Sequence, residues 1–168
     1  MEIWDLYDID RTVIGEHVRG EELPEAGYHL VVHVWIRDRE GKYLMTQRAA
    51  HKSYPLKWEC VGGSVLKGED SLSGAVREVA EETGVVLDGK EGKLLFTKVR
   101  GTINGKRYND IVDVWLFEYH GDVDLHKAST KEVVQVKWMK KTEIRALYEA
   151  GEMVSSIKDL RYSFDEME

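Results

Sequence analysis

Short hydrophobic stretches separated by polar turns run along most of this 168-residue chain. They are rich in Val, Ile, Trp and Tyr, and such β-branched and aromatic residues favour β-strands. The dipeptide Asn104-Gly105, which lies between two of the stretches, is typical of a tight hairpin turn. The pattern predicts strands at residues 28–36, 42–47, 58–61, 93–100, 108–119 and 133–139.

Helical periodicity begins after residue 70. An apolar stripe predicts a helix with Asp70 or Ser71 as its N-cap and with Gly84 just beyond its last turn. Gly74 inside this helix costs about 1 kcal/mol relative to Ala, and close packing against the preceding loop would account for it. The stripe consists of Leu72, Val76, Val79 and Ala80.

We expect a single domain over residues 1–168. Residues 1–27 would form an N-terminal hairpin or extension. Residues 141–168 would form a C-terminal helical segment, with a helix from Thr142 to Ala150 and a further helix or turn near residues 155–160. This order of elements predicts a mixed β-sheet with helices packed against it, which is an α+β or α/β fold.

The composition is that of an ordinary globular chain, with 42% hydrophobic residues, 33% charged residues and a net charge of −7. An acidic chain without a basic run argues against a nucleic-acid polymer or an anionic membrane as partner. Because Cys60 is the only cysteine, no intramolecular disulfide can form, in agreement with a reducing compartment. The N-terminus lacks a basic signal region and residues 30–36 are too few to span a bilayer, so we expect a cytoplasmic protein.

Three glutamates in the predicted helix indicate a metal site. Glu78, Glu81 and Glu82 are spaced i, i+3 and i+4, so a helix places their carboxylates on one face. A hard, oxygen-seeking cation such as Mg2+ relieves their mutual repulsion. Arg77 can hold one carboxylate through a bidentate contact. The alternative is a solvated acidic helix face, but the glycine-rich loop that precedes the helix favours the metal site.

The segment from Gly63 to Val85 resembles the signature of the Nudix hydrolase family. The resemblance implies the family's α/β/α sandwich with a mixed β-sheet, and a metal-dependent hydrolase of a phosphoanhydride bond. It extends upstream through residues 58–62 and covers about residues 4–151 of the chain. The defining positions, all filled, are Gly63, Glu69, Arg77, Glu78, Val79, Glu81, Glu82, Gly84 and Val85.

The upstream residues also resemble a sub-branch of the family that includes isopentenyl diphosphate isomerase, so an isomerase of this kind is an alternative. That enzyme carries a reactive cysteine directly before a Gly-His pair in the loop ahead of the helix. The corresponding position here is Gly62, whereas Cys60 stands two residues earlier, about 6–7 Å away along a strand. We therefore expect an intact hydrolase in which Cys60 is a small core residue.

A non-catalytic, nucleotide-sensing Nudix module is the second alternative. Such modules usually show a degraded signature or an attached DNA-binding domain, and neither is visible in this sequence. We therefore expect an enzyme whose substrate is a nucleoside or other organic diphosphate linked to a group X. A homodimer also agrees with the resemblance, because dimers are common in the family.

The resemblance implies roles for the signature residues. Glu78 and Glu82 would bind Mg2+ or Mn2+, with Glu81 nearby and the main-chain carbonyl of Gly63 as a further ligand. Glu78 or Glu81, in that order, would be the general base.

Arg77 and Glu69 would orient this cluster. Four further polar residues are candidates for contact with the substrate, and each has an ordinary alternative as a surface charge or a hydrogen-bonded, partly buried histidine. Glu132 has another role open to it, since some family members add a glutamate from a comparable loop to the metal cluster. The candidate substrate contacts are His29, Arg48, Lys52 and Glu132.

Overall fold

The structure is a computed structural model that describes residues 1–154. The helix or turn expected near residues 155–160 lies outside this range. None of the helices within residues 1–154 has the length and apolar character needed to cross a membrane.

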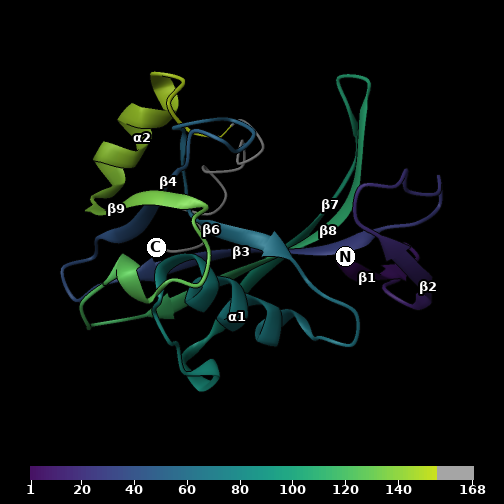
Figure 1. The fold of residues 1–168 in the computed structure, drawn as a ribbon, viewed down its shortest axis with the longest axis horizontal. Helices are drawn as coiled ribbons and strands as arrows, with labels where there is room; N and C mark the ends of the chain where they lie inside the picture. The colour runs from purple at the N-terminus through teal and green to yellow at the C-terminus, as the bar shows by residue number, and fades with distance from the viewer. Residues whose placement is uncertain (155–168) are drawn as a thin grey trace.

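Within residues 1–154, seven strands form one mixed sheet (Figure 1). Its main path runs β5-β4-β3-β8-β7, with β6 paired to β3 and β9 paired to β4. The β3–β8 pair at the centre is parallel, and the other pairs are antiparallel. The strands are β3 (His29–Arg37), β4 (Tyr43–Arg48), β5 (Trp58–Glu59), β6 (Val61–Ser64), β7 (Lys93–Ile103), β8 (Lys106–Glu118) and β9 (Val133–Met139).

The predicted strand at residues 58–61 is in fact divided between two partners. β5 pairs with β4, and after Cys60 the chain continues as β6, which pairs with β3. β6 extends into the glycine-rich loop because its glycines allow a close approach of the backbone. A Cβ on Gly62 would stand 3.1 Å from the carbonyl oxygen of Val32.

Helix α1 (Ser71–Thr83) has the ends that the sequence predicts. The side chain of Asp70 accepts a hydrogen bond of 2.7 Å from the backbone N–H of Ser73, as an N-cap does. Gly84 ends the helix with φ at 77°, a left-handed conformation that glycine adopts without strain.

Helix α2 (Lys141–Glu149) begins slightly earlier than predicted. Its N-cap is Lys140 and not Thr142. The side chain of Glu143 accepts a hydrogen bond from the backbone N–H of Lys140 at 3.2 Å, and this contact fixes the earlier start.

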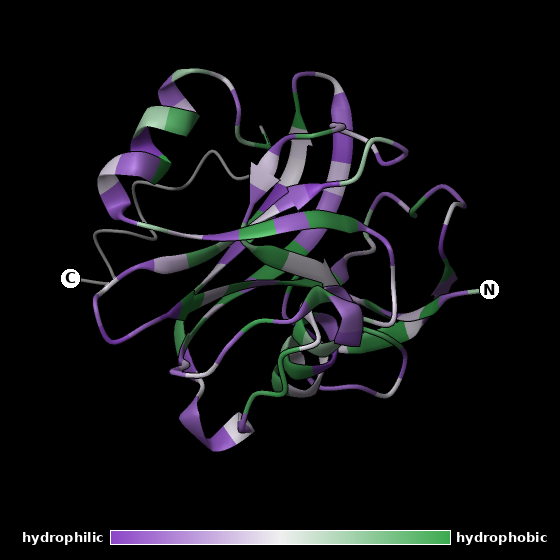
Figure 2. Ribbon diagram, turned by 60° about the vertical axis from the view of Figure 1, so that its left-hand side comes forward, coloured by the Kyte–Doolittle hydropathy of each residue, from purple (hydrophilic) through white to green (hydrophobic). Residues whose placement is uncertain are grey.

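The two helices cover opposite faces of the sheet (Figure 1). Val79 of α1 packs in one core with Val32, whereas Ile144 of α2 packs in the other core with Val31. Neighbouring residues of β3 therefore point into different cores, as the pleat requires. Figure 2 shows hydrophobic residues concentrated in the strands and in α1, and hydrophilic residues in the loops. This layered arrangement confirms the predicted α/β/α sandwich.

A separate hairpin precedes the sheet, as expected for residues 1–27. It consists of β1 (Ile3–Tyr7) and β2 (Val13–Val18). Two backbone hydrogen bonds of 2.8 Å, one in each direction, join Tyr7 to Tyr28 just before β3. These hydrogen bonds hold the hairpin against the chain at the N-terminal end of β3.

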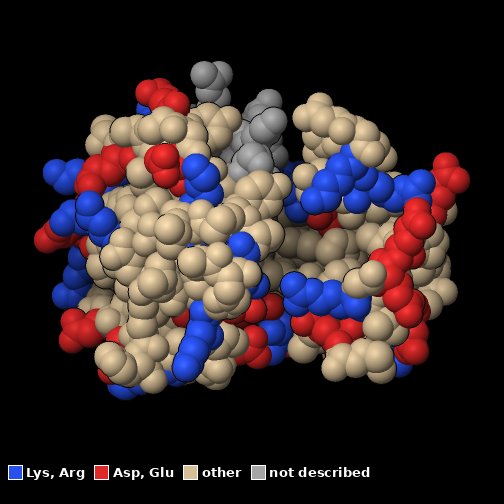
Figure 3. Space-filling model, turned by 45° about the horizontal axis from the view of Figure 1, so that its top comes forward, with Lys and Arg blue, Asp and Glu red and all other residues tan. Residues whose placement is uncertain are grey.

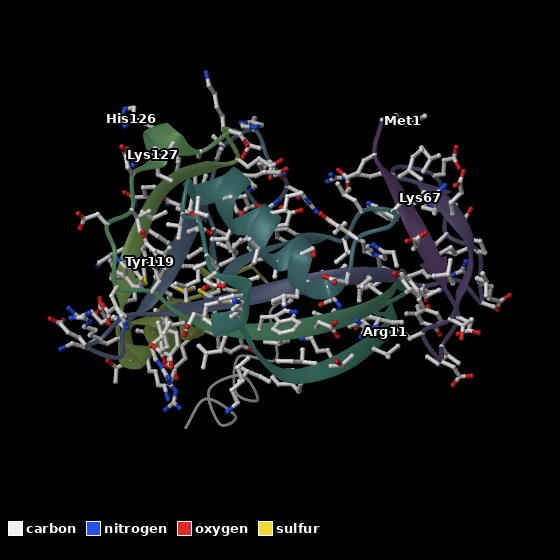
Figure 4. All side chains as sticks on the ribbon, turned by 90° about the horizontal axis from the view of Figure 1, so that it is seen from below. Met1, Arg11, Lys67, Tyr119, His126 and Lys127 are labelled. Atoms are coloured by element: carbon white, nitrogen blue, oxygen red, sulfur yellow. The ribbon has the colours of Figure 1, made fainter. Side chains whose placement is uncertain are left out.

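Arg11 in the turn of the hairpin makes a second anchor (Figure 4). Its guanidinium donates two hydrogen bonds, of 2.8 and 2.5 Å, to the carboxylate of Asp113 on β8, which is 1% exposed. The hydroxyl of Thr97 on β7 donates to the same carboxylate at 2.7 Å. The hairpin thus reaches over to the two strands that follow α1.

Candidate active site

Arg77 on α1 joins the loop and the helix of the signature. Its Nε and Nη2 donate to the carboxylate of Glu69 at 2.6 and 3.1 Å, and Nη2 also donates to the carbonyl of Ser64 at 2.9 Å. Its Nη1 donates to Oε1 of Glu78 and to Oε2 of Glu81, both at 3.1 Å. A single guanidinium therefore sets the positions of three carboxylates relative to the loop.

Glu69 also orders the loop. Its Oε2 accepts a hydrogen bond of 2.9 Å from the backbone N–H of Leu66. A Cβ on Gly74 would stand 3.0 Å from Cγ2 of Val65 and 3.3 Å from Oε2 of Glu69. The mid-helix glycine is therefore explained by close packing against the preceding loop, as predicted.

Gly63 and Glu78 are in direct contact. A Cβ on Gly63 would overlap the carboxyl group of Glu78. Burial raises the pKa of Glu78 to about 7, with the charges of Glu81 and Glu132 adding to the rise and Arg77 opposing it. Glu78 is thus a partly desolvated carboxyl group pressed against the backbone of the glycine-rich loop.

Glu82 is the most deeply buried member of the cluster. It is 6% exposed, and its Oε2 has no hydrogen-bond partner among the described residues. Burial raises the pKa of Glu82 well above its ordinary value, and the charges of Glu78, Glu59 and Glu132 raise it further. A buried carboxylate oxygen without a partner is costly unless a cation or a proton satisfies it.

Glu59 on β5 is a neighbour of this cluster that the sequence reasoning missed. Nη1 of Arg48 donates to Glu59 at 2.7 Å, while the rest of the guanidinium contacts the backbone and hydroxyl oxygens of Ser53 at 2.6 and 2.9 Å. Burial raises the pKa of Glu59, and Arg48 opposes this rise. The available signal was a charged residue between Trp58 and Cys60, in a segment that the sequence predicted as a strand.

The loop before β9 closes the other side of the site. The backbone N–H groups of Ser129 and Thr130 donate to the carbonyl of Glu81 at 3.0 and 3.1 Å. Glu132 forms an ion pair with Lys52 at 3.1 Å. The charge of Lys52 acts to lower the pKa of Glu82, so this ion pair lies close to the buried carboxyl group.

These groups line a cavity of about 560 Å³ that extends from the glycine-rich loop to the N-terminal hairpin. Figure 3 shows that acidic and basic side chains are interspersed on the face seen there. The carboxylates that line the cavity are Glu2, Glu78, Glu81, Glu82 and Glu132, and the basic side chains are Arg19, Arg48, Lys52, Lys67 and Arg77.

The residues of this cavity fit a divalent cation. Within residues 1–154, no three acidic, histidine or cysteine side chains stand already arranged around a common metal position. However, Glu82 offers an unsatisfied buried oxygen, and Glu78 retains Oε2 beyond its contact with Arg77. Carboxylate oxygens are the ligands that Mg2+ and similar hard cations prefer.

Comparison with known proteins places the chain in a family. A model of the NUDIX domain matches residues 27–160. The chain belongs to the Nudix family. An uncharacterized Nudix hydrolase of Listeria monocytogenes is 33% identical over 157 residues, which are 92% of this chain and 89% of the relative. The chain is accordingly a Nudix hydrolase.

Solved structures show the same fold. A crystal structure of a Deinococcus radiodurans protein matches this Nudix hydrolase with a TM-score of 0.76 and 20% identity, over 96% of this chain and 98% of that one. The MutT protein of Methanosarcina mazei matches with a TM-score of 0.66 and 25% identity, over 83% and 94% of the two chains.

His29 of this Nudix hydrolase lies outside the 560 Å³ cavity. Its ring stacks on Trp4, with centroids 4.3 Å apart, and it lines a second cavity of about 250 Å³. Burial lowers the pKa of His29 to about 4, and the nearby charge of Asp110 opposes this change. The structure brings Arg48, Lys52 and Glu132 to the signature helix, but it does not bring His29 there.

Cys60 faces the α2 side of the sheet, away from the signature helix. It is 1% exposed and packs in the core that contains Ile144. Burial raises the pKa of its thiol. Cys60 is therefore the small core residue that the sequence predicted.

Proposed function

We propose that this Nudix hydrolase cleaves a phosphoanhydride bond in a nucleoside or other organic diphosphate linked to a group X, using Mg2+ or Mn2+. The observation that carries the proposal is the buried, unpartnered Oε2 of Glu82 beside Glu78, at the wall of a polar cavity. Glu78 and Glu82 would hold the cation, with Glu81 and the carbonyl of Gly63 as further donors. When bound, the cation supplies water of lowered pKa and neutralises charge on the phosphate oxygens.

The side chains around the cation would position the reactants. Arg77 donates to Oε1 of Glu78 and to Oε2 of Glu81. Oε2 of Glu78 and Oε1 of Glu81 are not engaged by Arg77. Either of these oxygens could accept a proton from the attacking water, and Glu78 is the first candidate because it is the more buried of the two. Glu69 would act through Arg77 as a positioning residue.

Lys52 and Arg48 have different places in this proposal. Lys52 lines the cavity next to Glu132, so its ammonium group can contact a substrate phosphate. The guanidinium of Arg48 is engaged with Glu59 and Ser53, so Arg48 would support the loop that carries Lys52. His29 has no contact with substrate in this proposal, because it lines the other cavity.

A cation titration tests the proposal. Mn2+ should bind saturably to the wild-type protein, and Glu82→Gln should weaken the affinity at least tenfold. Glu91→Gln, which removes an exposed carboxylate that does not line the cavity, serves as the matched control and should bind as the wild type does. Unchanged affinity in Glu82→Gln would remove Glu82 from the ligand set.

A substrate screen tests the reaction itself. Release of phosphate or of a monophosphate should be measured with nucleotides, sugar nucleotides, dinucleotides and prenyl diphosphates, with Mg2+ or Mn2+ present. We expect turnover of at least one diphosphate, and loss of that turnover in EDTA. Absence of metal-dependent turnover across the whole panel would contradict the proposal.

A further inference from the structure

The N-terminal hairpin forms one wall of the catalytic cavity. Residues 1–3 and Arg19 at the hairpin ends line the cavity, opposite Glu78 and Glu81. The family model begins at residue 27 and so does not include the hairpin side of this wall, although the Listeria relative aligns over 92% of the chain and therefore shares part of the hairpin. Side chains on this wall can contact the group X of the substrate and so select among substrates that differ in X.

Backbone contacts fix the hairpin to the signature loop. The backbone N–H of Lys67 donates to the carbonyl of Ile3 at 2.9 Å, and the N–H of Gly68 donates to Oδ2 of Asp5 at 2.8 Å. Figure 4 shows Met1 and Lys67 on the same side of the molecule, beside the hairpin. The hairpin and the loop therefore form one unit, and a ligand at the wall meets a defined surface.

Arg19 of the hairpin and Lys67 of the adjoining signature loop are the basic side chains on this side of the cavity. Nη1 of Arg19 donates to Oε2 of Glu2 at 3.0 Å, and Nζ of Lys67 forms an ion pair with Glu16. The two basic side chains are 57% and 55% exposed, so these ion pairs stabilise the fold little. A guanidinium has five N–H donors and an ammonium has three, which leaves both groups with donors for an incoming anion.

The carboxylate of Glu2 would repel an anion, but its position is fixed on both oxygens. Its Oε1 accepts from Nε1 of Trp4 at 2.7 Å, and its Oε2 accepts from Arg19. Arg19 contacts Glu2 through Nη1, so its Nε and Nη2 donors remain for an incoming anion.

The formal charge of the cavity lining is balanced, and it favours a polyanionic ligand only once a divalent cation is bound. Five basic side chains and five carboxylates line it, so their formal charges cancel. A bound divalent cation would make the total positive. Lys52 and the cation held by the signature glutamates would contact the diphosphate, which leaves Arg19 and Lys67 in the same cavity for the group X.

The lining of the cavity also suits a hydrophilic X group. Its apolar side chains come from Met1, Ile3 and Leu66, and charged or small polar residues make up the rest. A volume of about 560 Å³ is sufficient for a diphosphate with a sugar-sized group. A long prenyl chain would leave most of these charged groups desolvated and unpaired.

We propose that the hairpin wall is a subsite for an X group that carries its own phosphate, with Arg19 and Lys67 as its ligands. This inference rests on the proposed hydrolysis of a diphosphate linked to X, and it specifies the chemistry of X as a phosphorylated, sugar-like group.

Two probes that differ by one phosphate test the subsite. They are 5-phosphoribosyl 1-diphosphate and ribosyl 1-diphosphate, assayed with Mg2+ on the full chain. The wild-type kcat/KM should favour the phosphorylated probe at least tenfold, which is what one charge-assisted contact supplies. In the double variant Arg19→Gln, Lys67→Gln this ratio should fall to about one, mainly through KM. Arg39→Gln removes an exposed charge outside the cavity and should keep the wild-type ratio.

Binding measured by calorimetry in EDTA separates this inference from the proposed function. The phosphorylated probe should bind the wild-type protein about tenfold more tightly than the other probe, and the double variant should lose this preference. If the preference in binding is present but neither probe is hydrolysed, the subsite stands and the proposed reaction fails for these substrates. If both probes are hydrolysed, or bound, with equal efficiency by the wild type, or if the ratio survives in the double variant, the subsite is wrong.

Discussion

Gly63 lies against the carboxyl group of Glu78, so closely that a Cβ at position 63 would overlap it. The glycine-rich loop and the signature helix therefore meet at a point where only a hydrogen fits. Gly63 was expected as a metal ligand through its carbonyl group, and the structure adds a steric reason for a glycine at this position. The contact limits the positions that the Glu78 side chain can take.

Gly63→Ala should lower kcat by about 10²-fold or more, because the new methyl group must displace the Glu78 carboxylate from its place in the cluster. Steady-state kinetics on whichever diphosphate is turned over, together with a thermal melt, measure the effect. Gly101→Ala is the matched control, since a Cβ there meets no atom within 4 Å. Equal kcat values in the two variants would show that the contact with Glu78 has no functional consequence.

Glu78 should matter more for hydrolysis than Glu132. Glu78 is buried in the signature cluster, whereas Glu132 is 38% exposed at the side-chain level and pairs with Lys52. Glu78→Gln should lower kcat by about 10²-fold or more, as expected for loss of a base or a metal ligand. Glu132→Gln should have a smaller effect in the same assay. The reverse order would move the base or ligand role to the loop before β9.

Cys60 should be dispensable for turnover. Because the thiol is buried in the α2-side core, Cys60→Ala should cost about 1 kcal/mol of unfolding free energy and leave kcat nearly unchanged. The wild-type protein should not interconvert isopentenyl and dimethylallyl diphosphate. Isomerisation that depends on Cys60 would overturn the assignment as a hydrolase.

Arg11→Met should lower the unfolding free energy by about 2–3 kcal/mol at pH 7, because it leaves the buried carboxylate of Asp113 without its cation. The double variant Arg11→Met, Asp113→Asn should recover part of this loss in urea unfolding experiments. A double variant less stable than Arg11→Met alone would contradict an ion pair that acts as a unit.

The effect of Arg11 should also depend on pH. Burial alone would raise the pKa of Asp113, but hydrogen bonds from Arg11, Ser71 and Thr97 lower it below its ordinary value. A lowered pKa contributes stability above the unfolded-state pKa of about 3.9, and this contribution is lost as the pH falls through the folded-state value. The stability difference between wild type and Arg11→Met should therefore narrow below about pH 4. A difference that stays constant to pH 2 would contradict this linkage.

The sequence by itself determined the elements whose causes are local. The β-branched and aromatic residues of β3 and β8, an N-cap at Asp70 or Ser71 and a helix end at Gly84 all depend on neighbours within a few residues. The spacing of the signature glutamates determined, in the same way, that they share one helix face. The start of α2 was predicted at Thr142, whereas the helix has Lys140 as its N-cap, where the side chain of Glu143 accepts from the Lys140 backbone N–H.

Only the tertiary structure decided which distant segments meet at the site. The parallel pairing of β3 with β8, the division of residues 58–64 between β4 and β3, and the burial of Glu59 beside Glu82 depend on contacts between residues far apart in sequence. The exclusion of His29 from the 560 Å³ cavity, and the inclusion of Arg19 and Lys67, were decided by where the hairpin docks. Periodicity records which way a side chain points from its own strand, but it carries no information on which other strand lies opposite.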